Sequence, residues 1–300
     1  ILHERNDSLN TKNDTTSIQT VYQKISTFLT KFSLKKLAIK DMVVIHQNYI
    51  SKNAINTLKF QHVNMLFEDL LIDSITQYDS TRFMYAKNAV ISLGKFKAPT
   101  ADSLYMISLD SIVINATGKF ASIDSIAFTP RDSKNEFVEK MPYLKERYTA
   151  QFEHVLLQHI DWWEFLSNEG FSAKNMILEN GKLEIYTDRN LPPFPKSKVG
   201  NYPHQLLMKL SIPVSLDSMI IKNLDLTYEE NNPDSKLHGK IFFNNISGYV
   251  YNINNQPATN TNTIMKIKAN CDLMNDGRLD ATFLFDVTQT STGAFSVSGE

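Results

Sequence analysis

Strict alternation of apolar and polar residues is the feature that most constrains how this chain can fold. The clearest run covers residues 279–288, where every second residue is apolar, and shorter runs lie at 265–273, 224–228 and 183–185. Successive side chains of a β-strand point to opposite faces, so a period of two predicts strands with one apolar and one polar face. Fully buried parallel strands would show continuous apolar runs, so the alternation favours an antiparallel sheet that is covered on one side.

Turn dipeptides between these runs predict how the strands are joined. Asn-Gly and Asp-Gly suit type I′ hairpins, because both central residues of that turn need a positive φ. A loose repeat accompanies them, since residues 34–45 and 214–226 both contain two alternating stretches around a short Asp or Asn break. The sequence therefore predicts a long meander of hairpins. The predicted turns are Asn180-Gly181, Asp276-Gly277 and, as weaker signals, Thr117-Gly118 and Ser247-Gly248.

A few helices are predicted beside the strands. Behind N-cap candidates at 14–17, apolar residues recur at spacings of three and four, which predicts an amphipathic N-terminal helix. Residues 1–15 are predicted to be disordered or a linker, so that residues 16–300 form a single elongated region. The helical stretches are predicted over residues 16–32 and near residues 135–150, 160–168 and 203–210.

The composition argues against several classes of function. Lys and Arg total 31 against 32 Asp and Glu, a net charge of −1, whereas a nucleic-acid binder needs a basic excess or a concentrated basic stripe. The single cysteine, Cys271, cannot form an intramolecular disulfide or a cysteine zinc cage. His154 and His159 are five residues apart, which does not fit the spacing of four in a helical zinc pair. We therefore expect no nucleic-acid partner and no bound metal.

Catalytic motifs are also missing from the sequence. It contains no Gly-x-Ser-x-Gly elbow, no phosphate-binding glycine loop and no dinucleotide fingerprint. Acid pairs such as Glu229-Glu230 lie within alternating runs, where a solvated strand face explains them better than a catalytic dyad. An enzyme whose site assembles from residues distant in sequence stays open. The expectation is a non-enzymatic protein without a cofactor.

The apolar face of the strands is what remains to be explained. A sheet must cover such a face, and the cover could be a second sheet, as in a closed sandwich, or a ligand held in a trough. Acyl chains would suit a trough, because each buried methylene contributes about 0.8 kcal/mol. Another interpretation is a structural or carbohydrate-binding module at the cell surface. Its candidate stacking rings are Trp162, Trp163 and Tyr186.

Several segments of the chain resemble the AsmA-like family of bacterial envelope proteins, and the resemblance extends over most of residues 20–300. The matching segments are the repeated Leu-x-x-Leu-x-Ile-x-Asp/Asn runs, the helix-then-strand opening at 21–47, Asn-Gly at 180, and Asp276-Gly-Arg-Leu-Asp-Ala-Thr-Phe-Leu-Phe-Asp286. Tyr228-Glu-Glu, Gly239-Lys-Ile-Phe-Phe and Pro192-Pro-Phe-Pro are similar to variants from the Bacteroidetes side.

This resemblance implies both a fold and a function. The implied fold is mainly β with a few helices: a long, curved antiparallel meander with an apolar inner face and the N-terminal helix packed at one end. The family is implicated in outer-membrane homeostasis and resembles bridge-like lipid-transfer proteins, so the expected partner is a phospholipid or other acyl-chain lipid, bound or conducted along a hydrophobic β-groove. The expected location is the periplasm, with a tether to the inner membrane through a segment outside this chain. The residues expected to line the groove are Leu224, Leu226, Met265, Ile267, Leu279, Phe283, Phe285 and Val287.

Overall fold

All strands described by the computed structural model belong to one sheet. The structure describes residues 21–51, 54–167, 170–195, 199–200, 202–233, 238–256, 262–289 and 292–300. Within them, thirteen strands follow one another across the sheet in chain order, except that the short β4 pairs with β5 alone. The strands are β1 (Phe32–Ser51), β2 (Ala54–Ile72), β3 (Asn88–Leu93), β4 (Phe96–Pro99), β5 (Tyr105–Asn115), β6 (Phe120–Pro130), β7 (Arg147–Gln158), β8 (Phe171–Asp188), β9 (Val214–Asn231), β10 (His238–Asn254), β11 (Ile264–Leu273), β12 (Gly277–Asp286) and β13 (Phe295–Gly299).

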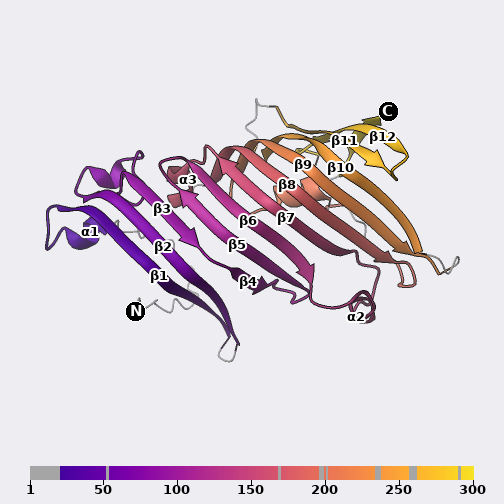
Figure 1. The fold of residues 1–300 in the computed structure, drawn as a ribbon, viewed down its shortest axis with the longest axis horizontal. Coiled ribbons are helices and arrows are strands. Elements are labelled where there is room, and N and C mark those ends of the chain that lie inside the picture. The colour runs from indigo at the N-terminus through magenta and orange to yellow at the C-terminus, as the bar shows by residue number, and fades with distance from the viewer. Residues whose placement is uncertain are drawn as a thin grey trace.

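The sheet is long, open and curved, and it runs from indigo β1 to yellow β12 in Figure 1. The chain exposes 20080 Å² of surface, whereas a compact monomer of 34.3 kDa exposes about 13,000 Å². Among the described residues no second sheet lies against the first, so they do not form the closed sandwich that was the alternative. The prediction of a mainly β protein built on a long curved sheet is confirmed.

One pair of strands departs from the predicted antiparallel meander. β8 and β9 are parallel along their whole length, from Phe171 opposite Val214 to Asp188 opposite Asn231. Parallel neighbours cannot be joined by a tight hairpin and need a crossover connection, which residues 189–213 supply here. The sheet is therefore mixed, and the prediction of a purely antiparallel sheet is wrong at this one junction.

The helices are four short segments, and the first of them corrects a prediction. Among the described residues the helix ends at Ile25 and β1 already begins at Phe32, so the predicted helix does not extend to residue 32. Phe28 is 84% exposed and α1 contributes no buried residue, so packing of an amphipathic helix at this end of the sheet is not confirmed. Residues 16–20 of that prediction, and the linker predicted over 1–15, lie outside the described residues. The helices are α1 (Val21–Ile25), α2 (Lys134–Glu139), α3 (Trp162–Leu166) and α4 (Pro203–Met208), with a 3₁₀ turn η1 (Thr76–Tyr78).

The three later helices lie where helical insertions are predicted. The insertion near 135–150 is shorter than expected, because α2 ends at Glu139 and β7 begins at Arg147. Ser133 and Glu136 form a reciprocal capping box that fixes the start of α2. No helix in the described part of the chain has the length and hydropathy needed to cross a membrane.

A row of left-handed residues crosses the middle of the sheet. Each interrupts the alternation of its strand and shifts it by one residue. The pairing register shifts beside Asp41, His62, Asn223 and Asn245, as at a β-bulge, whereas it continues unchanged past Ser111 and Asn180. In β9, for example, Ile221 and Leu224 occupy the same face although they are three residues apart. Asparagine and aspartate tolerate this backbone better than most residues. The row comprises Asp41 (φ 53), His62 (φ 53), Ser111 (φ 49), Asn180 (φ 51), Asn223 (φ 59) and Asn245 (φ 55).

This row explains two wrong turn predictions. Asn180-Gly181 and Ser247-Gly248 lie inside β8 and β10, not between strands, so neither makes a hairpin. Amide side chains instead connect left-handed residues, because Asn223 Nδ2 donates to Asn180 Oδ1 at 2.9 Å. Hairpins do join β5 to β6 and β11 to β12, as predicted, but the positive φ angles fall on Lys119 in the first and on Met274 and Asn275 in the second. Gly277 already pairs with Leu273 as the first residue of β12, so the predicted type I′ turn at Asp276-Gly277 is wrong.

We expect the left-handed residue in β9 to be sensitive to side-chain shape. Replacing Asn223 by Val should lower the free energy of unfolding by about 1–3 kcal/mol, because a β-branched residue is strained at positive φ. Asn223→Gly relieves that strain and should cost much less. Chemical denaturation of both variants, with Thr227→Val in the same strand as the control, measures the difference. Equal losses for the Val and Gly variants would contradict the assignment of a strained bulge.

Candidate functional site

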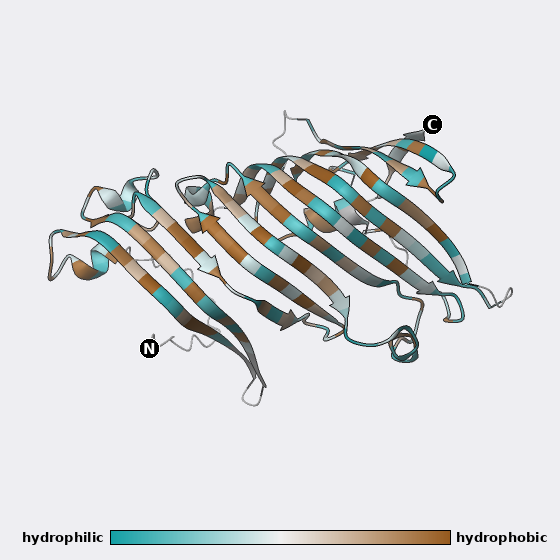
Figure 2. Cartoon of the chain, viewed as in Figure 1, coloured by the Kyte–Doolittle hydropathy of each residue, from teal (hydrophilic) through white to brown (hydrophobic). Residues whose placement is uncertain are grey.

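The two faces of the sheet differ in chemistry, and the pairing register assigns residues to each. Residues directly opposite one another in neighbouring strands share a face. Between β5 and β6, Leu109 lies opposite Ile126 on one face, whereas Asp110 lies opposite Ser125 on the other. Figure 2 shows the resulting bands of brown and teal along the strands. We call the first side the apolar face; it carries Leu37, Met65, Phe67, Ile91, Ile107, Ile112, Ile123, Phe128, Phe152, Leu183, Val250 and the residues opposite them.

All eight residues predicted to line a groove lie on the apolar face. Ile267 is opposite Phe283, and Met265 is opposite Phe285. Leu279 is opposite Cys271, and Leu224 and Leu226 continue the same face in β9. Val287 follows β12 and packs against Met265. The register thus brings the eight together on one surface, and their contact with a ligand stays a prediction.

Helix α4 covers part of this surface. Leu207 and Met208 of α4 pack against a cluster in which Val250, Met265 and Val287 are buried. Ile267 and Phe285 belong to the same cluster, so four of the eight predicted lining residues have contacts of their own within the chain. At this end of the sheet the protein supplies its own cover. These four side chains are therefore packed by other residues of the chain, as in an ordinary hydrophobic core.

Helix α3 covers the apolar face at a second place. Trp162 packs edge-on against Phe83, with ring centroids 5.6 Å apart, and joins the cluster around Phe67, Ala86 and Ala89. Asp161 caps this helix by accepting from the backbone amides of its first turn. Trp162 is thus a packing residue rather than an exposed stacking ring.

The stacking row proposed for carbohydrate is not formed. Tyr186 is only 4% exposed, and the amine of Lys134 lies 4.7 Å from its ring centroid. It also lies 15 residues along β8 from Phe171, where α3 docks, which corresponds to about 50 Å of strand. Trp162, Trp163 and Tyr186 therefore share no exposed surface, and that interpretation is wrong for these three rings.

Between the two helices, the apolar face runs across the central strands. In the described residues no helix side chain belongs to a buried cluster with Leu109, Ile112, Ile123 or Ile126. Sequence reasoning missed these four residues, because the left-handed residue Ser111 breaks the period of two between Leu109 and Ile112. A search for such residues should allow two alternating runs to be separated by a step of three residues, instead of two, where the residues between them include Asp, Asn or Ser.

A hollow of about 470 Å³ lies at one end of the central strands. Its floor is aromatic: Tyr105 stacks on Phe128 with centroids 4.3 Å apart, and Tyr148 lies beside them. Burial raises the pKa of the Tyr105 and Tyr148 hydroxyls, so both stay uncharged at neutral pH. The rim is charged, since Lys145 Nζ lies 3.7 Å from Asp102 Oδ2. The hollow can therefore hold an apolar group beside a polar mouth.

No known family model matches the chain, and no curated protein matches it either. Within the described residues, no group of three or more His, Cys, Asp or Glu side chains is arranged to hold a metal ion.

The contact between α4 and the sheet contains a buried histidine. His204 is 1% exposed, its ring lies 5.0 Å from that of Phe285, and neither ring nitrogen has a hydrogen-bond partner among the described residues. Burial disfavours the charged ring, and it lowers the pKa of His204 below its ordinary value of 6.5. The folded protein therefore holds this imidazole neutral.

We expect acid to destabilise the fold through this residue. Below pH 6.5 the unfolded chain takes up a proton that folded His204 does not, so stability falls with pH by up to about 1.4 kcal/mol per unit from this group. Well above pH 6.5 the histidine is neutral in both the folded and the unfolded chain, so it no longer makes the free energy of unfolding depend on pH. Urea unfolding between about pH 5 and 7.5 measures the slope, which should shrink in His204→Phe and persist in the exposed control His46→Gln. An unchanged slope in His204→Phe would contradict this account.

Proposed function

We propose that this chain is a non-enzymatic lipid-binding segment whose apolar face holds acyl chains. The observation that carries the proposal is the unbroken apolar face across the sheet, which no helix covers at Leu109, Ile112, Ile123 and Ile126 within the described residues. Soluble proteins rarely leave contiguous apolar patches of more than a few hundred Å² exposed unless a partner or ligand covers them. A ligand with long apolar chains fits a strip that runs across many strands.

The setting of the proposal follows from the resemblance in the sequence. A segment of an AsmA-like protein would lie in the periplasm, tethered to the inner membrane through a part outside this chain, and would contribute to outer-membrane homeostasis. The bound partner would be a phospholipid or another acyl-chain lipid. The single-layer sheet supports this, because it leaves one side of a long surface available where a sandwich would close it.

Photocrosslinking on adjacent residues of one strand tests the proposal directly. Benzoylphenylalanine placed at Ile126 points to the apolar face, whereas at Ala127 it points to the other, since Ala127 lies opposite Ser108 and Gln151. We expect a phospholipid adduct from Ile126 and none from Ala127 when the protein is irradiated in cells and analysed by mass spectrometry. Equal labelling at both positions, or none at Ile126, would rule out the apolar face as the binding surface.

A charge on the apolar face should remove bound lipid without unfolding the protein. Ile123→Glu places a carboxylate among the chains, where its desolvation is unfavourable, whereas Ser122→Glu places the same group on the opposite face. We expect native mass spectrometry to show lipid lost only from Ile123→Glu, with circular dichroism confirming the fold of both. Lipid retained in both variants would contradict the proposal.

Affinity should also depend on acyl length. Each methylene that leaves water contributes about 0.8 kcal/mol, so each added methylene should tighten binding about fourfold until the chain exceeds the strip. A series of fluorescent lipids with increasing acyl length measures this slope. A flat series would mean that the headgroup, not the acyl chain, carries recognition.

A further inference from the structure

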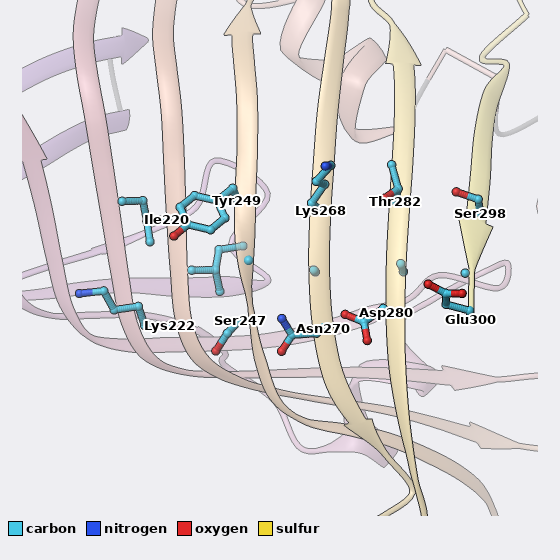
Figure 3. A pocket seen from close by; sticks show the side chains of 15 residues that line it. Ile220, Lys222, Ser247, Tyr249, Lys268, Asn270, Asp280, Thr282, Ser298 and Glu300 are labelled. Carbon is cyan, nitrogen blue, oxygen red and sulfur yellow. The ribbon is translucent and has the colours of Figure 1, made fainter.

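A depression of about 750 Å³ lies on the other side of the sheet, across β9 to β13. The labelled side chains in Figure 3 form two rows across β9 to β13, and the smaller residues between the rows complete the lining. The register explains the rows, because Lys268 lies opposite both Tyr249 and Thr282, and Asn270 lies opposite both Ser247 and Asp280. The upper row is Ile220, Tyr249, Lys268, Thr282 and Ser298, and the lower row is Lys222, Ser247, Asn270, Asp280 and Glu300.

The bulges described above border this depression. Asn223 follows Lys222 in β9, and Asn245 lies two residues before Ser247 in β10. Since a bulge bends its strand, two adjacent bulges at one level bend the sheet there. The backbone amide of Asn223 donates to Ser247 Oγ at 3.3 Å, which ties the bend to the lower row.

The lining mixes polar and apolar groups and carries no net charge. Two cations, Lys222 and Lys268, are balanced by two carboxylates, Asp280 and Glu300. Lys222 is already paired with Glu179 at 2.7 Å. The balance disfavours a strongly anionic or cationic ligand, and an acyl chain is disfavoured because it would desolvate the two lysines and two carboxylates.

Several lining groups can still hydrogen-bond to a ligand. The side chains of Lys268, Asn270 and Thr282 make no hydrogen bond to another described residue. Together they offer an ammonium donor, a carboxamide that both donates and accepts, and a hydroxyl that does both. Such a mixture suits a ligand that presents many neutral hydroxyl groups.

An aromatic platform stands beside these polar groups. Tyr249 is 46% exposed, and its ring stacks on that of Tyr251 with centroids 5.8 Å apart and an interplanar angle of 11°. Exposed tyrosines combine an apolar ring with a polar hydroxyl, which makes them common at recognition surfaces. A pyranose ring has an apolar face of C–H groups that packs on such a ring while its hydroxyls point sideways.

We propose that this depression binds a neutral saccharide chain, with one sugar ring stacked on Tyr249 and its hydroxyl groups bonded to the two polar rows. The site is separate from the apolar face, because its side chains leave the sheet on the opposite side. It uses different residues from the Trp162, Trp163 and Tyr186 set that the sequence suggests. The protein would then hold lipid and glycan on its two sides at once.

Titration of the 300-residue chain with neutral hexasaccharides tests this proposal. The probes are chitohexaose, cellohexaose and maltohexaose, with hyaluronan oligosaccharides as the anionic comparison, and binding is followed by ligand-observed NMR and calorimetry. We expect at least one neutral probe to bind more tightly than hyaluronan. Tyr249→Ala should weaken that binding about tenfold through the loss of ring contact, whereas Tyr249→Trp should preserve it.

Matched variants separate the site from general effects on the fold. Thr282→Val replaces the hydroxyl by a methyl group of similar size and should weaken binding. Tyr78→Ala, which removes a ring that is 68% exposed elsewhere, should not. Ile123→Glu on the apolar face should leave saccharide binding unchanged even if it removes lipid. The proposal is overturned if no neutral probe binds, if Tyr249→Ala binds as well as the unmodified chain, or if hyaluronan binds most tightly.

Discussion

Backbone pairing between neighbouring strands is the interaction on which this structure depends. The sheet has no second layer within the described residues, and its buried side chains gather in small clusters under α3 and α4. Each strand is therefore held chiefly by the hydrogen bonds and cross-strand contacts it makes with its neighbours. Long strands compensate for the thin core, since β1, β2, β8 and β9 each contain 18 to 20 residues. An extended single layer is the architecture that leaves both faces available for ligands.

The row of left-handed residues bends the sheet and keeps its apolar side chains on one face and its polar side chains on the other. Six strands bend at one level, and at each bend the alternation slips by one residue, which keeps the apolar side chains on one face beyond the bend. Without the slip, Leu224 and Ile112 would move to the polar side. The same bends border the depression beside Tyr249. A single backbone device thus supports the continuous apolar face and the polar depression opposite it.

The sequence predicts the regular parts of this fold and misses the places where regularity stops. β11 and β12 alternate without interruption, so the face on which each of their residues lies follows from period two alone. The left-handed residue Asn180 has the same dipeptide signature as a hairpin, because both need a positive φ, and only pairing with Asn223 decides between them. The sequence also does not reveal that β8 and β9 are parallel, because these two strands alternate apolar and polar residues just as the antiparallel strands do. The depression on the polar face could not be predicted from the sequence, because its lining residues come from five strands and are brought together only by the pairing register.

Helix α4 gives the apolar surface a direction. The helix belongs to the crossover between β8 and β9, so the chain attaches it to the sheet at both ends. Because it is attached, it would compete with a bound acyl chain at a high effective concentration. If the apolar face binds an acyl chain as proposed, a chain that extended from the central strands towards β12 would have to displace Leu207 and Met208, whereas one that stayed within β5 to β7 would meet no helix side chain from a buried cluster of the described residues. The covalently attached helix would therefore limit how far a bound chain extends along the sheet.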